Sequence, residues 1–164
     1  MLENVFKSSL GLRFSPAEVV KEIIRYMQAE PNHAYAMTIG TDSMKLANEM
    51  ADFVTAIVVH RIGRGGRYFY RRIDQAQPGV LRDRIIEEVV MSLDVATSFL
   101  KQFQDAASTA TLPKYSFAIH VDVGENGETK KLIAEVIGMV RGMNFEARMK
   151  PESYAASNIA DRHT

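Results

Sequence analysis

Residues 35–43 read Tyr-Ala-Met-Thr-Ile-Gly-Thr-Asp-Ser, and residues 115–122 read Tyr-Ser-Phe-Ala-Ile-His-Val-Asp. Both segments are short and rich in apolar and β-branched side chains, which is typical of buried strands. Each expected strand ends at an aspartate, Asp42 or Asp122, and a third aspartate, Asp161, lies three residues before the end of the sequence. Neighbouring carboxylates repel one another, so a cluster of them usually binds a cation. If the three converge, we expect Mg²⁺ or Mn²⁺ and phosphoryl-transfer chemistry.

Length and composition set the class of protein. The 164 residues, of which 46% are hydrophobic, predict a single domain spanning 1–164 with one core. Basic and acidic residues number twenty each, so net charge identifies no partner. No run is long and apolar enough for a membrane span, and no signal-peptide pattern is present. The absence of cysteine excludes disulfides and thiolate metal sites, and it favours a cytoplasmic location.

Helical periodicity and caps predict four helices. Ser15-Pro-Ala-Glu18 is a capping-box pattern with proline at the first helical position. Apolar residues at helical spacing follow it, and the same spacing recurs in three later segments. The expected helices cover 16–29, 80–104, 128–141 and 152–162.

Runs of β-branched and aromatic residues predict five strands. The second and third of them flank a glycine-rich turn, Gly63-Arg-Gly-Gly66, and should form an antiparallel hairpin. The polar stretch 43–52 is expected to be irregular. The expected strands cover 34–41, 53–60, 67–73, 115–121 and 145–149.

The order of these elements resembles a ribonuclease H-like fold, a mixed five-stranded α/β sheet with helices on both faces, here with an extra N-terminal helix. Local motifs make the resemblance closer, because they are similar to those of the YkuK family of bacterial ribonuclease H-like proteins. The resemblance covers nearly the whole chain. The motifs are Gly-Thr-Asp-Ser (40–43), His-Arg-Ile-Gly-Arg-Gly-Gly-Arg-Tyr-Phe-Tyr (60–70), Asp-Val-Gly-Glu-Asn-Gly (122–127), Lys-Pro-Glu-Ser-Tyr-Ala-Ala-Ser (150–157) and Ala-Asp-Arg (160–162).

The resemblance implies a set of metal ligands. Ribonuclease H-like nucleases hold two Mg²⁺ ions with about four carboxylates. Their pattern assigns Asp42 to the first strand, Asp122 to the end of the fourth strand and Asp161 to the last helix. One feature departs from the pattern, because Ser43 follows Asp42 where ribonuclease H commonly has glycine.

The fourth acid of the pattern lies on the helix after the third strand, where two glutamates are adjacent. Glu87 and Glu88 point about 100° apart on a helix. Glu88 shares the apolar stripe of Leu81 and Ile85, which should face the sheet. We therefore expect Glu88 as the catalytic and metal-binding residue, with Glu87 as the alternative.

A basic, aromatic hairpin is the candidate nucleic-acid interface. Arginine side chains bind phosphate, and aromatic rings stack on unpaired bases. We expect nucleic-acid contacts from Arg61, Arg64, Arg67 and Tyr68, with Lys130, Lys150 and Arg162 as possible additions. A solvated hairpin with an aromatic core strand is the alternative interpretation.

Three functions remain open at this point. The first is a Mg²⁺- or Mn²⁺-dependent endonuclease acting on RNA, an RNA–DNA hybrid or another structured nucleic acid. The second is a non-catalytic nucleic-acid-binding module that uses the hairpin 60–72. The third is an oligomeric scaffold that pairs through the hairpin edge. Each acid also has an ordinary structural role, because aspartate often forms turns or caps helices.

Overall fold

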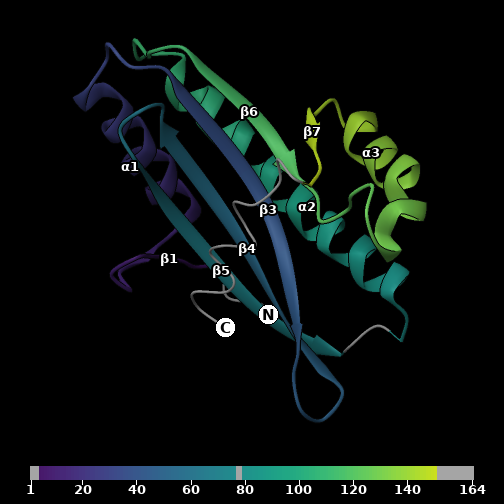
Figure 1. The fold of residues 1–164 in the computed structure, drawn as a ribbon. Coiled ribbons are helices and arrows are strands. Elements are labelled where there is room, and N and C mark those ends of the chain that lie inside the picture. The colour runs from purple at the N-terminus through teal and green to yellow at the C-terminus, as the bar shows by residue number, and fades with distance from the viewer. Residues whose placement is uncertain (1–3, 77–78, 151–164) are drawn as a thin grey trace.

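The computed structural model describes residues 4–76 and 79–150, whose elements are shown in Figure 1. The helix expected at 152–162, together with Asp161, lies outside these residues. In the described part of the chain, no helix combines the length and the apolar character that crossing a membrane requires.

The described strands form one mixed sheet of seven strands in the order β2-β1-β5-β4-β3-β6-β7. β3, β4 and β5 pair antiparallel, whereas β6 and β7 add in parallel on the other side of β3. The predicted mixed α/β class is confirmed, with β3 to β7 as the five predicted strands. The bounds are β1 Phe6–Ser8, β2 Arg13–Phe14, β3 Tyr35–Lys45, β4 Met50–Arg61, β5 Gly66–Ala76, β6 Tyr115–His120 and β7 Ala147–Arg148.

Two N-terminal strands enlarge the sheet beyond the predicted five. β1 and β2 are three and two residues long, and Gly11 in the turn between them has a φ of 80°. β1 pairs antiparallel with β5, placing Lys7 opposite Tyr70. Strands this short contain too few alternating residues for a recognisable period of two, so the sequence pattern does not reveal them.

The segment 43–52, expected to be irregular, is mostly β-hairpin. β3 continues to Lys45 and β4 begins at Met50, with Asn48 at a φ of 63° in the turn between them. Cross-strand pairing outweighs the polar character of this segment. Asp42 therefore lies inside the antiparallel ladder and not at the end of its strand.

Three of the four predicted helices lie within the described residues and form with nearly the predicted bounds. α1 spans Pro16–Ala29, α2 spans Leu81–Ala107, and α3 spans Ile133–Gly142 after a 3-10 turn at Glu128–Leu132. The capping box of α1 is complete, because Ser15 Oγ accepts from the backbone N–H of Glu18 at 3.2 Å and Glu18 Oε1 accepts from that of Ser15 at 3.0 Å.

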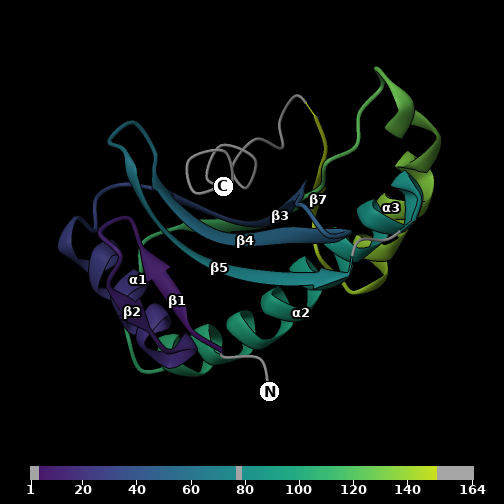
Figure 2. The same cartoon turned by 90° about the horizontal axis from the view of Figure 1, so that it is seen from below.

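The described helices pack on one face of the sheet. Figure 2 shows α1 and α2 beneath the same face. The main core cluster joins Tyr35, Met37 and Ile39 of β3 to Val89 of α2 and Val136 of α3. We call this the helix face and the opposite one the far face. Helices on both faces were expected, but no helix within 4–76 and 79–150 covers the far face.

Alternation along β3 assigns its remaining side chains to the far face. Because successive strand residues point to opposite faces, Thr38, Gly40 and Asp42 face away from α2. A small apolar cluster lies on the same side, where Ala56 packs with Tyr68 and other β4 and β5 side chains. The far face therefore carries polar and aromatic side chains, while Val54 and Ala56 of β4 on the same face are fully buried.

Candidate metal centre

Three carboxylates from separate elements meet beside β3. Asp42 lies on β3, Glu88 on α2 and Asp122 two residues after β6, and one oxygen of each lies within 4.8 Å of the others. Two oxygens bound to one Mg²⁺ at about 2.1 Å lie at most about 4.2 Å apart. Small side-chain rotations would therefore bring all three carboxylates onto a single ion.

The end of the β3–β6 ladder explains how these residues meet. The last pair of that ladder is Gly40 with His120. Beyond it, the described residues place no strand along this edge of β3. Asp42 consequently reaches from the far face around the edge, toward the loop that carries Asp122 and toward Glu88 on the helix face.

The side chain of Asp42 is held by the backbone of the next residue. Its Oδ1 atom accepts a hydrogen bond of 2.9 Å from the backbone N–H of Ser43. A carboxylate has about four lone-pair positions, so this bond is compatible with simultaneous binding of a cation.

Glu88 is the most buried of the three acids. The residue is only 3% exposed, and its Oε1 atom accepts a hydrogen bond of 2.5 Å from Ser43 Oγ. The other oxygen, Oε2, is buried and finds no hydrogen-bond partner among the described residues. Burial raises the pKa of Glu88 well above its ordinary value, and the charges of Asp42 and Asp122 raise it further against the opposing effects of Ser43 and Arg84.

Asp122 is paired with a lysine. Lys150 Nζ lies 2.6 Å from Asp122 Oδ1, and the lysine side chain is 53% exposed. The hydrogen bond to Asp122 raises the pKa of Lys150, and the nearby charges of all three acids add to this effect. The ammonium group therefore supplies a positive charge at the edge of the acidic cluster.

The backbone around Lys150 fixes where this ammonium lies. The N–H of Lys150 donates to the carbonyl oxygen of Val123 at 2.9 Å. A Cβ atom at Gly124 would lie 3.1 Å from the Cβ of Lys150, so only glycine leaves this approach unstrained. From the sequence, Lys150 is only a possible nucleic-acid contact. Its position beside Asp122 depends on the pairing of β7 with β6, which local patterns do not predict.

A buried row of hydroxyl groups anchors α2 to the sheet beside the acids. Thr41 Oγ1 lies 2.8 Å from Thr55 Oγ1 and 2.8 Å from Ser92 Oγ. Ser92 is one helical turn after Glu88, and Thr41 is two residues before Ser43. A buried hydroxyl without a hydrogen-bond partner destabilises the fold, so this row favours one position of α2 and therefore of Glu88.

Of the two adjacent glutamates, one lies near the other acids. Glu88, on the apolar stripe of α2, lies in the cluster with Asp42 and Asp122. Glu87 is not a member of that cluster. Of the four acids predicted from the sequence, three come together, and Asp161 lies outside the described residues.

Arg61 is engaged inside the protein. Its guanidinium donates to the hydroxyl oxygen of Tyr35 at 2.9 Å and to the backbone carbonyl of Tyr26 at 2.8 Å, and it pairs with Glu30. It also stacks over the Tyr26 ring, 3.9 Å from the centroid. These contacts join β4 to the C-terminal end of α1, which is a structural role.

The predicted nucleic-acid arginines at the turn between β4 and β5 lie far from the acids. Arg64 is in the hairpin turn with a side chain 61% exposed, and Arg67 pairs with Glu22 at 3.3 Å. The turn follows Arg61, which pairs with the start of β3, seven residues before Asp42. At about 3.3 Å per residue this separation is about 23 Å. Tyr68 is nearer to Asp42 along the sheet and lies on the far face.

Arg72 is the arginine in register with the acidic cluster. Asp42 pairs with Val54 on β4, and Val54 pairs with Arg72 on β5. Directly paired residues share a face, so Arg72 and Asp42 both project from the far face, about 10 Å apart at two strand spacings. Arg72 pairs with the buried Asp52 at 3.1 Å, and its side chain remains 42% exposed.

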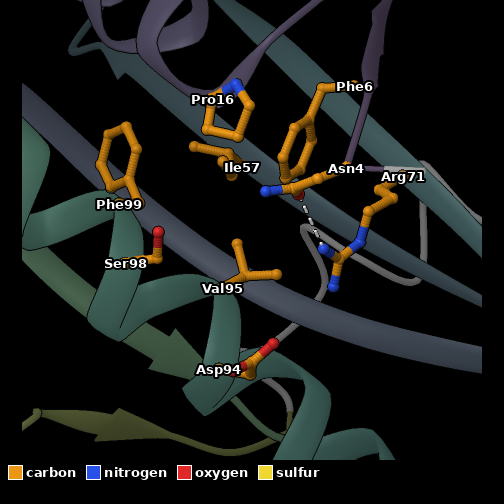
Figure 3. A pocket seen from close by; sticks show the side chains of 9 residues that line it. All are labelled: Asn4, Phe6, Pro16, Ile57, Arg71, Asp94, Val95, Ser98 and Phe99. Carbon is orange, nitrogen blue, oxygen red and sulfur yellow. Dashed lines mark hydrogen bonds between the residues drawn. The ribbon is translucent and has the colours of Figure 1, made fainter. Parts of the chain in front are cut away.

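A separate cavity of about 240 Å³ lies on the helix face, between β4, β5 and the helices. Figure 3 shows Arg71 and Asp94 approaching it from opposite walls, with Phe6 and Phe99 forming apolar sides. Arg71 donates to Asn4 Oδ1 at 3.1 Å. None of the three clustered acids lines this cavity.

The three acids fit a hard divalent cation. Carboxylate oxygens are the ligands that Mg²⁺ and Mn²⁺ prefer. Glu88 presents a buried oxygen without a partner, and burying a carboxylate in this way is costly unless a cation or a proton compensates it. In the described residues no histidine belongs to the cluster, so the donor set contains oxygen alone.

Comparisons with known proteins agree with the predicted family and fold class. A family model described as "Ribonuclease H-like" matches residues 18–164. The uncharacterized protein YkuK of Bacillus subtilis (strain 168) is 31% identical over 154 residues, covering 90% of this chain and 89% of that protein. No solved structure was found to match the chain.

Proposed function

Because the chain belongs to the ribonuclease H-like family, and within it to the YkuK proteins, we propose that it is a divalent-metal-dependent nuclease. Family membership points to nuclease-like chemistry on nucleic acid. The finer proposal is hydrolysis of phosphodiester bonds in RNA, an RNA–DNA hybrid or a structured nucleic acid. The convergence of Asp42, Glu88 and Asp122 within 4.8 Å is the observation that carries it.

The proposed ligands are Asp42, Glu88, Asp122 and Asp161, which would together hold two Mg²⁺ or Mn²⁺ ions. When bound there, the ions would polarise the scissile phosphate and the attacking water. Asp42 comes from the far face and Glu88 from the helix face, so the proposed ligands approach an ion from different directions. No side-chain nucleophile is required.

The chain's own residues prepare this site in two ways. Ser43 orients Glu88 through its hydroxyl and Asp42 through its backbone N–H. Lys150 compensates the charge of Asp122. Cation binding requires Glu88 to lose its proton, which its raised pKa opposes until an ion arrives.

A cleavage assay tests the proposal. Labelled RNA, RNA–DNA hybrid and branched DNA would be incubated with Mg²⁺ or Mn²⁺ under single-turnover conditions. Asp42→Asn, Glu88→Gln and Asp122→Asn should each reduce cleavage by at least about 100-fold, since even partners of metal ligands cost 10- to 100-fold. Glu87→Gln, adjacent on α2 but outside the cluster, is the matched control and should cleave normally.

One observation favours a second function, a nucleic-acid-binding module without catalysis. Lys150 already places an ammonium 2.6 Å from Asp122, so part of the acidic cluster is compensated without a metal. In that case wild type and Asp42→Asn would bind nucleic acid equally well, and neither would cleave any substrate. Contacts from the hairpin 60–72, including the exposed Arg64, would then account for binding.

A further inference from the structure

The N-terminal hairpin, formed by β1 and β2, lines a basic groove together with β5 on the far face. A groove of about 450 Å³ runs between them, and its lining includes Lys7, Arg13, Tyr70 and Arg72. The register places Arg13 opposite Lys7 and Lys7 opposite Tyr70, so these three side chains project from one face in a line across neighbouring strands. We call this the hairpin groove.

The charges of the hairpin groove favour an anionic ligand. Lys7 and Arg13 are exposed, and Arg72 is 42% exposed beside its partner Asp52. The side chain of Lys7 forms no hydrogen bond or ion pair with another described residue. One carboxylate, Asp74, also lines the groove, so the three cations outnumber it.

The position of the groove connects it to the acidic cluster. Lys7, Tyr70 and Arg72 lie on the same face as Asp42, and Arg72 is in the same cross-strand row as Asp42 through Val54. The groove therefore ends, at Arg72, about 10 Å or two strand spacings from Asp42. The arginines at the turn between β4 and β5 lie about 23 Å along the sheet from Asp42, so they are less suitably placed to contact the same ligand.

We propose that the hairpin groove binds the sugar–phosphate backbone of a single nucleic-acid strand, leading that strand across the sheet to Asp42. This inference rests on the proposed function and assigns its substrate path. Lys7, Arg13 and Arg72 contact phosphates, and Tyr70 offers a ring for one base. Arg13 and Lys7 share one cross-strand row with Tyr70, and Arg72 lies two residues farther along β5 in the row of Asp42. This single path of cations matches one backbone and not the two backbones of a duplex.

Metal-free binding measurements separate this inference from catalysis. Fluorescence anisotropy with labelled oligo(U) in EDTA would compare wild type with Lys7→Ala/Arg13→Ala over a range of salt. Loss of two phosphate contacts should weaken binding at least about tenfold at low salt and reduce the slope of log K against log salt by about 1.4. Lys7→Glu/Arg13→Glu should weaken binding further, with unfolding temperatures checked for both variants.

The matched control removes the same charge elsewhere. Lys21→Ala/Arg25→Ala lies on the exposed side of α1, on the helix face, and should leave the salt slope unchanged. An unchanged slope in the groove variant would overturn the inference, even if the enzyme cleaves RNA. Tighter binding of blunt double-stranded RNA, or equal competition by polyglutamate, would overturn the single-strand assignment. If wild type cleaves no substrate but its binding still depends on Lys7 and Arg13, the result counts against the proposed catalysis and not against the groove.

Discussion

Ser43 Oγ donates a hydrogen bond of 2.5 Å to Oε1 of the buried Glu88. The same residue donates its backbone N–H to Oδ1 of Asp42 at 2.9 Å. One serine thus positions two of the three clustered acids, one from the sheet and one from the helix. Its place directly after Asp42, where ribonuclease H commonly has glycine, is a departure that the structure connects to the position of Glu88.

Removing this hydroxyl should weaken metal binding. Ser43→Ala leaves Glu88 Oε1 buried without its donor, which should reduce the free energy of unfolding by about 1–3 kcal/mol and Mn²⁺ affinity by about tenfold. Chemical denaturation and calorimetric Mn²⁺ titration measure the two effects. Ser98→Ala, on the exposed side of α2, is the control. Unchanged Mn²⁺ affinity in Ser43→Ala would show that the hydroxyl does not position Glu88.

Metal binding should release a proton from Glu88. Its raised pKa keeps the carboxyl protonated at pH values where an ordinary glutamate is ionised. Because a cation binds the ionised form, Mn²⁺ affinity should rise with pH through the folded-state pKa of Glu88. Calorimetry in two buffers of different ionisation enthalpy would count the released protons. Glu88→Gln should bind Mn²⁺ weakly without proton release, and identical enthalpies for wild type in both buffers would contradict the prediction.

Lys150 should compete with the metal. Lys150→Met removes the ammonium beside Asp122, so Mn²⁺ should bind about tenfold more tightly, equivalent to about 1.4 kcal/mol. Without metal, the same variant should be less stable, because the three acids lose a compensating charge. Lys130→Met, an exposed lysine in the same part of the chain, is the control for the loss of one positive charge. Weaker Mn²⁺ binding by Lys150→Met would contradict this prediction and would show that the lysine favours metal binding.

A second carboxyl pair makes stability depend on pH. Burial raises the pKa of Asp52 to about 6, and its hydrogen bond with Asp74 adds to this effect against the opposing charge of Arg72. The unfolded value is near 3.8, so between pH 4 and 6 the folded state binds more protons. The free energy of unfolding should therefore fall as pH rises through this window, by at most about 3 kcal/mol from Asp52.

The variant Asp52→Asn isolates that contribution. His120 acts in the opposite direction, because burial lowers its pKa to about 4 and its share of stability increases with pH. The pH dependence of the wild-type free energy of unfolding therefore combines both contributions and does not isolate that of Asp52. Urea denaturation between pH 4 and 7 should show Asp52→Asn gaining stability relative to wild type as pH rises. A constant difference across this range would contradict the raised pKa, and Asp105→Asn serves as the exposed control.

Local sequence patterns predict most elements of this fold and the position of Glu88 on the side of α2 that faces the sheet. The stripe that Glu88 shares with Ile85 is a helical periodicity, and the capping box of α1 is a local hydrogen-bond pattern, so both can be read from neighbouring residues. The same kind of pattern predicts that Asp42 and Asp122 lie at strand ends. This placement is right for Asp122 and wrong for Asp42, which lies within the ladder of β3.

Long-range pairing accounts for what the sequence does not reveal. Lys150 reaches Asp122 because β7 joins β6, and Lys7 reaches Tyr70 because a three-residue strand joins β5. Neither contact has a local signal. The cluster of arginines near Arg61 is a strong local signal, yet Arg61 is used internally and Arg72 is the member in register with Asp42.

Whether Asp42, Glu88 and Asp122 hold a divalent cation can be seen by anomalous diffraction from crystals grown with Mn²⁺. We expect an anomalous peak within coordination distance of all three carboxylates, about 2.0–2.3 Å from each bound oxygen, with Lys150 moved away from Asp122. A peak-free cluster at saturating Mn²⁺, with Lys150 still bound to Asp122, would contradict this prediction.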